Sequence, residues 1–165
     1  QKTYGKVYIA LGVNELGYNN DKGYYEKFCA AVDEVRRVQP NAVIYIQSLI
    51  PVNEAQYLAA TGHDYLTNDP LRIYNQLMQQ VAEEKKVAYV NVYEAFADEN
   101  GSLPEGDSRD GVHLYKESCQ RWLEYLRTHT VEFDTLYPDG PPPVEVPDPE
   151  PAGPDTSTAD GSGQG

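Results

Sequence analysis

An aspartate and a histidine three residues apart are the side chains of this sequence best suited to acid–base chemistry. They are Asp110 and His113, with Gly111 and Val112 between them. A carboxylate that holds one ring nitrogen of a histidine leaves the other nitrogen free to act as a general base. The same spacing also fits a helix start, with Asp110 capping backbone N–H groups and His113 on the surface. The pair alone leaves both interpretations open.

A second polar group follows the first apolar run of the chain. Gly12 and Asn14 come directly after residues 7–11. If that run is a strand of a parallel sheet, Asn14 lies at the carboxyl end, where functional groups gather, and its amide could donate to a developing oxyanion. Gly12 would permit the sharp turn. The alternative is a simple turn in which Asn and Gly only tolerate unusual backbone angles.

Three short apolar runs predict the strands that would position these groups. They cover residues 7–11, 43–49 and 88–92, and they are nearly continuous, as in strands covered on both faces. Helical patterns lie at residues 22–38, from an N-cap at Asp69 onward, and at 115–129. The order predicts an α/β fold with a parallel sheet between helical layers.

The first helical pattern separates apolar from polar positions. Tyr25, Phe28, Cys29, Val32 and Val35 share the expected inner stripe, while Glu26, Lys27, Glu34 and Arg36 are expected to stay on the polar side. Cys29 and Cys119 lie on separate predicted helices without metal-ligand spacing, so we interpret both as ordinary buried thiols.

Together the two motifs resemble sequence blocks of the SGNH, or GDSL-type, esterase and lipase family. Residues 8–15 resemble the third block, Gly-x-Asn-Asp, with Glu15 in place of Asp, and residues 110–114 match the fifth block, Asp-x-x-His. The likeness covers about residues 6–127. It implies a flavodoxin-like three-layer α/β/α fold, His113 as general base, Asp110 as its orienting partner, Asn14 and Gly12 at the oxyanion and substrate site, and no cofactor.

The serine nucleophile of that family has no counterpart in this sequence. The first block, with Gly-Asp-Ser after the first strand, and the second block would precede residue 1, so we expect the fold to lack its N-terminal strands. Gly106-Asp107-Ser108 repeats the letters. However, it follows no strand and opens no helix, which predicts a loop role for Ser108. Ser48 is expected to be a strand hydroxyl, and His63 and His129 are expected on the surface.

The C-terminal part of the chain differs sharply in composition. From residue 132 to 165 there are eight prolines, five glycines, eight acidic residues and no Lys or Arg. Such a segment cannot bury enough apolar surface to fold, so we predict a domain over residues 1–131 and a disordered acidic tail over 132–165. The tail is typical of an extracellular spacer and favours a secreted or cell-envelope setting.

These observations favour a hydrolase acting on ester bonds by serine acyl transfer, inactive as written because the nucleophile block is absent. Its substrate would be a small ester or an acylated glycan. The alternative is a degenerate, non-catalytic module that binds a glycan or a protein.

The charge of the chain argues against a nucleic-acid partner. The formal net charge is −13 for the whole chain and −5 for residues 1–131, and no cluster of basic residues could bind phosphates. No apolar run spans a membrane. An exposed sheet edge predicts self-association.

Overall fold

The computed structural model describes residues 2–144. Strands β1 (Lys6–Ile9), β2 (Val43–Gln47) and β3 (Ala88–Val90) form a parallel sheet in the order β1-β2-β3. The helices are α1 (Asp21–Val38), α2 (Glu54–Thr61), α3 (Asn68–Glu84), α4 (Lys116–Thr128) and the short α5 (Phe133–Leu136). Single 3-10 turns are η1 (Val13–Glu15), η2 (Val92–Ala95) and η3 (Glu105–Asp107).

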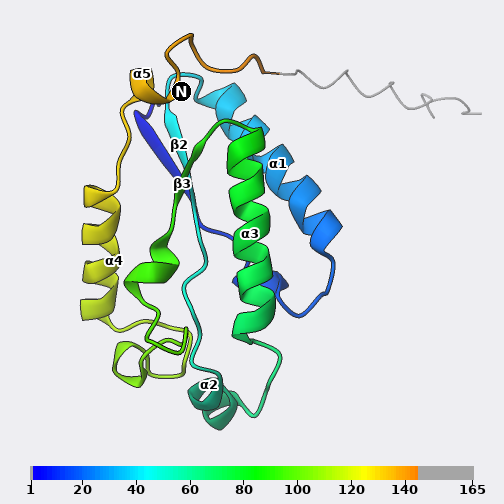
Figure 1. Cartoon of the computed structure of the whole chain (residues 1–165), viewed down its shortest axis with the longest axis vertical. Coiled ribbons are helices and arrows are strands. Elements are labelled where there is room, and N and C mark those ends of the chain that lie inside the picture. The colour runs from blue at the N-terminus through cyan, green and yellow to red at the C-terminus, as the bar shows by residue number, and fades with distance from the viewer. Residues whose placement is uncertain (1, 145–165) are drawn as a thin grey trace, which may run out of the picture.

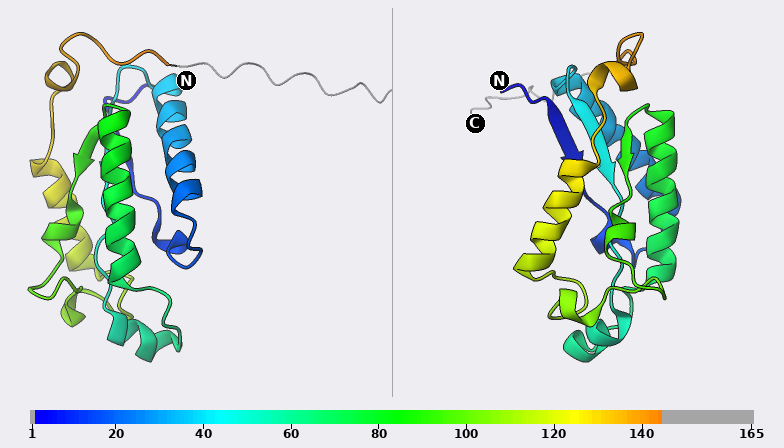
Figure 2. Two further views of the ribbon diagram at one scale, coloured as in Figure 1. Left: turned by 45° about the vertical axis from the view of Figure 1, so that its right-hand side comes forward. Right: turned by 60° about the vertical axis from the view of Figure 1, so that its left-hand side comes forward.

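Helices cover both faces of the sheet, which confirms the predicted three-layer α/β/α class. Helices α1 and α3 lie on one face and α4 lies on the other (Figures 1 and 2). The central strand β2 is buried along its whole length, because its side chains point alternately into two apolar clusters. Ile44 and Ile46 belong to the cluster under α1 and α3, and Val43 and Tyr45 to the one under α4.

The boundaries of the three strands and of one helix differ from the sequence prediction for local reasons. Each strand ends before its apolar run does. The Leu11 carbonyl after β1 bonds the Tyr24 hydroxyl, Leu49 after β2 bonds a side-chain amide, and the chain enters η2 after β3. Helix α3 begins at Asn68 with Thr67 before it, so Asp69 is not the N-cap. The buried Asn68 side chain instead accepts from the N–H of Val52 at 2.9 Å and donates to the Val52 carbonyl, also at 2.9 Å.

The folded body continues beyond the predicted boundary at residue 131. Helix α5 precedes Tyr137, which is 4% exposed, and its hydroxyl accepts a hydrogen bond of 2.9 Å from Arg36. Arg36 also donates to the carbonyl of Lys85 at 3.1 Å and is 3% exposed, so it is buried rather than on the polar side of α1. The rest of the predicted tail, residues 145–165, lies outside the described residues.

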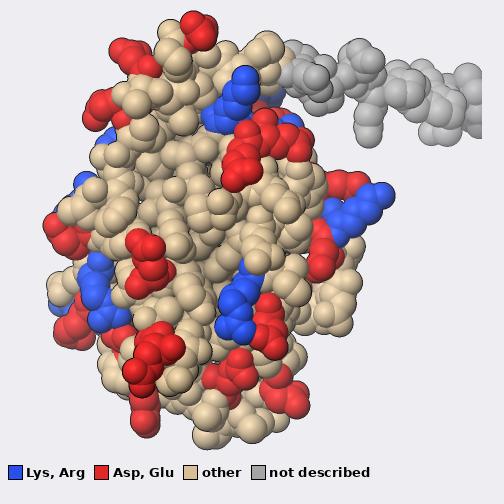
Figure 3. All heavy atoms as spheres, in the orientation of Figure 1, with Lys and Arg blue, Asp and Glu red and all other residues tan. Residues whose placement is uncertain are grey.

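Other sequence expectations concern single residues and the surface. Cys29 is partly buried, but Cys119 is exposed, so the prediction of a buried thiol is wrong there; both are free thiols. Among the described residues, no helix is both long and apolar enough to cross a bilayer. On the face drawn in Figure 3, basic side chains are scattered among acidic ones rather than gathered in one patch.

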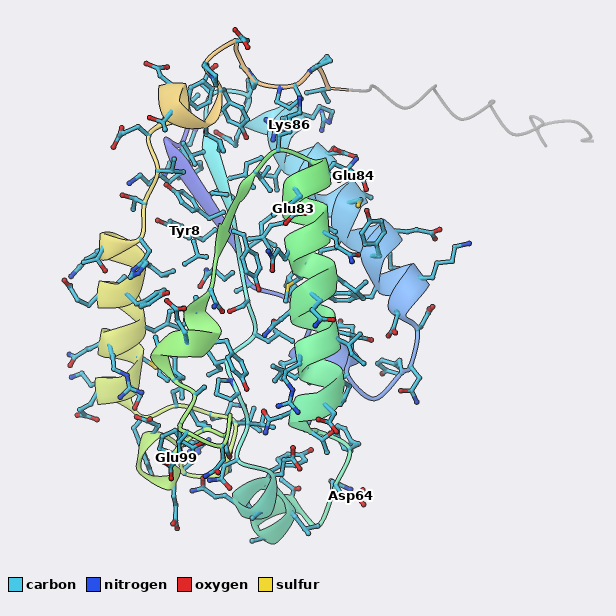
Figure 4. The ribbon with its side chains drawn as sticks, viewed as in Figure 1. Tyr8, Asp64, Glu83, Glu84, Lys86 and Glu99 are labelled. Carbon is cyan, nitrogen blue, oxygen red and sulfur yellow. The ribbon has the colours of Figure 1, made fainter. Side chains whose placement is uncertain are left out.

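Strand β1 forms an open edge of the sheet. Tyr8 lies on the α4 side of this strand (Figure 4), where it stacks on Tyr45 with ring centroids 4.5 Å apart. The Gly5 carbonyl accepts from the N–H of Val43, and alternate residues of a parallel strand bond to alternate neighbours. The N–H and C=O groups of Lys6 and Tyr8 therefore face the open edge.

We expect this edge to make the protein associate with itself. The mass measured by sedimentation should rise with concentration for the wild type, because unpaired strand edges pair with other chains. Lys6→Pro should suppress that rise, since it removes an edge N–H from the first residue of the strand without breaking a ladder bond. Lys6→Ala is the control. A wild type that stays monomeric at every concentration would contradict the prediction.

Candidate active site

The loop between η3 and α4 holds Asp110 and His113 in direct contact. His113 Nδ1 lies 2.8 Å from Asp110 Oδ2, and the other carboxylate oxygen accepts the N–H groups of His113 at 2.8 Å and Val112 at 3.1 Å. The carboxylate therefore caps a turn and holds the ring at once. It does not cap a helix, because α4 begins only at Lys116, with Tyr115 as its N-cap. The His113 side chain is 72% exposed, and that of Asp110 only 22%.

The surroundings keep Asp110 ionised. Burial by itself would raise the pKa of the Asp110 carboxyl, but the backbone N–H of His113, its ring and the N–H of Val112 outweigh that effect and hold the pKa well below its usual range. An imidazole bound through Nδ1 to a carboxylate presents Nε2 as a proton acceptor. The pair can thus carry out general-base chemistry on a group placed beside the exposed ring.

Helix α2 holds this loop from one side. Gly111 is buried with φ of 84°, and its carbonyl accepts from the N–H of Asn53, the N-cap of α2, at 2.9 Å. A Cβ at Gly111 would come within 2.4 Å of the Asn53 carbonyl oxygen, so only glycine fits. The Gln56 amide adds a bond of 2.8 Å to the carbonyl of Ser108.

Helix α4 holds the start of the same loop from the other side. The buried Asp107 carboxylate accepts from Ser118 Oγ at 2.7 Å and from Arg121 at 2.8 Å. Burial alone would raise the pKa of Asp107, but its bonds to Arg121 and Ser118 lower the pKa overall. The guanidinium of Arg121 in turn lies 4.5 Å from the centre of the Phe96 ring. The loop is therefore anchored to α2 and α4.

The two serines of interest lie in structural positions. Ser108 is fully buried; its hydroxyl donates to the carbonyl of His113 at 2.9 Å, and it pairs with Leu114 as an isolated antiparallel bridge. Ser48, 2% exposed, accepts from the N–H of Tyr93 at 2.8 Å. Neither hydroxyl is presented to a substrate. His63 and His129 are exposed, as the sequence predicted.

The turn after β1 presents Asn14 at the carboxyl end of the sheet. Gly12 is buried with φ of 134°, which only glycine adopts readily, and it leads into η1, where Asn14 is exposed. Between this turn and helix α1 is a cavity of about 430 Å³ lined in part by Leu11, Tyr24 and Phe28.

Two aromatic rings link this turn to the His113 loop. Tyr57 of α2 lies under Gly111, where an added Cβ would be 3.2 Å from the Tyr57 Cβ. Its ring meets Tyr65 edge-on with centroids 5.7 Å apart, and Tyr65 packs against Gly17 just after η1. In Figure 4, Asp64, next to Tyr65, and Glu99 mark this end of the molecule, opposite Glu83, Glu84 and Lys86. Both predicted motifs therefore lie at the same end of the sheet.

The sequence places Tyr57 and Tyr65 in the segments that connect the strands, where tyrosines can line a pocket, but it does not predict that they hold these loops. Fourteen tyrosines are spread through the chain, and nothing in their spacing separates the supporting rings from those of the core. The glycines of the two motifs are the one usable signal. A glycine lets the backbone approach another group closely, so it predicts that a bulky side chain lies beside it. The identity of that neighbour depends on contacts distant in sequence.

The parallel α/β fold with an Asp–His pair at the carboxyl end of its sheet is an arrangement compatible with a hydrolase. Its family follows from sequence comparison. The model of the GDSL-like lipase/acylhydrolase family matches residues 3–121, and the chain belongs to that family. No curated protein matches the chain closely enough to count as a relative.

Solved structures share the fold. A Streptococcus pneumonia protein provisionally described as a platelet activating factor is 27% identical with a TM-score of 0.67, over 80% of this chain and 59% of that one. A GDSL-like lipase from Bacteroides thetaiotaomicron is 20% identical with a TM-score of 0.59, over 75% and 60%. A protein provisionally described as an acylhydrolase, from Bacteroides fragilis, is 16% identical with a TM-score of 0.61, over 80% and 62%. This chain thus spans about 60% of their length.

Proposed function

We propose that this chain supplies the general base and an oxyanion donor of a serine esterase whose nucleophile lies in polypeptide outside residues 1–165. The contact of 2.8 Å between His113 Nδ1 and Asp110 Oδ2, beside an exposed ring, is the observation that carries this proposal. Family membership supports ester bonds as the target. The substrate is a small ester or an acylated glycan.

The reaction proceeds by two acyl transfers. His113 Nε2 takes the proton of the serine hydroxyl as its oxygen attacks the ester carbonyl, and Asn14 donates to the oxyanion. The protonated His113 gives that proton to the departing alkoxide, which leaves an acyl-serine. Water then repeats the sequence and releases the acid. Throughout, the ionised Asp110 holds the ring and stabilises its protonated form.

The longest polypeptide encoded through this region provides the test. If it contains a Gly-Asp-Ser block before residue 1, we expect hydrolysis of p-nitrophenyl acetate, with kcat reduced by about 10⁴-fold or more in His113→Ala because the base is lost. Unchanged activity in His113→Ala would contradict the proposal. A start codon without any such block would favour the second candidate, a non-catalytic module that binds a glycan or a protein, which the burial of Ser48 and Ser108 already favours.

Residues 1–165 alone serve as the internal control for the nucleophile. We expect this chain to hydrolyse the ester no faster than free imidazole at the same concentration, and Ser108→Ala to change nothing, because the Ser108 hydroxyl is fully buried. Enzyme-like turnover that disappears in Ser108→Ala would show that Ser108 is the nucleophile and would overturn the assignment of an external serine.

A further inference from the structure

Two tyrosine hydroxyls hold the turn that carries Asn14, one at each end of it. Tyr24, on α1, donates a hydrogen bond of 3.0 Å to the carbonyl of Leu11. Tyr74, on α3, donates a hydrogen bond of 3.0 Å to the carbonyl of Glu15. The carbonyls that bracket Asn14 are therefore tied to two different helices of the same layer (Figure 1).

The two rings also support each other. They stack with centroids 4.2 Å apart and planes 21° from parallel, and Tyr24 and Tyr74 are 9% and 2% exposed. Burial, with smaller effects from Glu15 and Tyr74, raises the pKa of Tyr24 far above its usual range, so this hydroxyl remains a donor at any pH at which the protein is studied. A stacked, buried pair has little rotational freedom, which makes both hydroxyls rigid donors.

Gly12 allows the close contact between the turn and the Tyr24 hydroxyl. A Cβ at Gly12 would lie 2.5 Å from the Tyr24 hydroxyl oxygen, so the turn can approach the hydroxyl only because residue 12 has no side chain. The glycine of the sequence motif is thus explained by the tyrosine above it as well as by its φ of 134°.

Leu16 anchors the end of this turn in the core, but the turn's own hydrogen bonding is sparse. Element η1 is a single 3-10 turn without a side-chain N-cap, closed by the bond of 3.0 Å from the Glu15 N–H to the Gly12 carbonyl. Such turns are weak by themselves. The cavity of about 430 Å³ is lined by Leu11, Glu15 and both tyrosines, so the turn is not fully packed where the two hydroxyls meet it. An oxyanion donor that shifts by about 1 Å loses much of its effect.

We propose that Tyr24 and Tyr74 are positioning residues that hold Asn14 in place for oxyanion stabilisation. This inference rests on the proposed role of Asn14, but the restraint on the turn is a property of residues 1–165 and can be measured without any activity. The Tyr→Phe substitution removes each hydroxyl while keeping the stacked ring.

The experiment compares backbone hydrogen exchange in Tyr24→Phe, Tyr74→Phe and the double variant. The reporters are the N–H groups of Glu15 and Tyr18, the latter bonded to the Glu15 carbonyl at 3.0 Å. We expect the double variant to exchange at least about fivefold faster there, since each lost bond contributes about 0.5–1.5 kcal/mol. Unchanged exchange at both amides would overturn the proposal.

Tyr45→Phe is the matched control. Tyr45 is also buried and stacked on another tyrosine, and its hydroxyl donates 3.0 Å to a main-chain carbonyl, that of Val131. This variant should lower the denaturation midpoint without accelerating exchange at Glu15 and Tyr18. Equal acceleration in Tyr45→Phe would show a general loss of stability rather than positioning.

A kinetic readout separates this inference from the proposed function. In the longer, active polypeptide the double Tyr24/Tyr74→Phe variant should lower kcat by at least about fivefold with KM unchanged, because the loss falls on the transition state. Activity that depends on His113 but not on these hydroxyls would refute the positioning role and leave the function intact. Accelerated exchange in a polypeptide without esterase activity would support the restraint of the turn by the two tyrosines and refute the proposed function.

Discussion

Gly111→Ala is expected to lower the free energy of unfolding by about 2–3 kcal/mol, the largest stability effect that we predict for a single methyl group. Its φ of 84° is costly for any other residue, and the new Cβ would lie 2.4 Å from the Asn53 carbonyl oxygen and 2.8 Å from the Tyr57 backbone nitrogen. Because these are backbone atoms in the first turn of α2, they cannot relieve the clash by a change of rotamer. The His113 loop must separate from α2 to accommodate the methyl group.

Gly140→Ala is the matched control for that prediction. Gly140 has nearly the same φ, 87°, but an added Cβ would meet nothing within 4 Å. Urea unfolding of the two variants therefore separates the conformational cost, common to both, from the steric clash at Gly111. We expect Gly140→Ala to lose only about 1 kcal/mol. Equal losses would mean that α2 does not restrain the loop.

Apolar periodicity was sufficient to predict the layers of this fold. The runs around Ile44 and Tyr89 are short and nearly continuous, and such runs occur where a strand is covered on both faces. The Asp110–His113 pair could be predicted for a different reason. A spacing of three residues lets one carboxylate both cap a turn and reach the histidine ring. Local geometry was enough in both cases.

The sequence did not predict interactions between residues that lie far apart along the chain. Arg36 looks like a surface residue of an amphipathic helix, yet one nitrogen of its guanidinium bonds the Lys85 carbonyl and the hydroxyl of Tyr137, 101 positions away, and both side chains are buried. The same contact draws α5 into the body, although proline and acidic residues dominate the composition that follows. The residue type determines how much free energy it costs to bury a charged side chain. Whether hydrogen bonds offset that cost depends on partners that only the tertiary structure brings close.

Asp110→Asn is expected to reduce stability in a way that depends on pH. The amide keeps an oxygen that can accept the N–H groups of Val112 and His113 but loses the charge that strengthens those bonds. At pH 7 we expect a loss of about 1–3 kcal/mol in the free energy of unfolding, measured by urea titration. In the longer polypeptide the same change should also lower kcat, because the protonated His113 loses its counter-charge.

The sign of the pH dependence follows from the carboxyl pKa. The pKa of Asp110 in the folded protein lies below the unfolded value of about 3.8, so its ionised form stabilises the fold at higher pH. That stabilisation is fully present above about pH 5 and declines as the pH falls through 3.8 toward the folded pKa. The gap between wild type and Asp110→Asn should therefore narrow on acidification. Asp69→Asn, at a highly exposed carboxylate, is the control and should show little gap at either pH. A gap for Asp110→Asn that is the same at pH 7 and pH 3 would mean that the amide fails through its shape, and that the charge on Asp110 contributes nothing to holding the His113 loop.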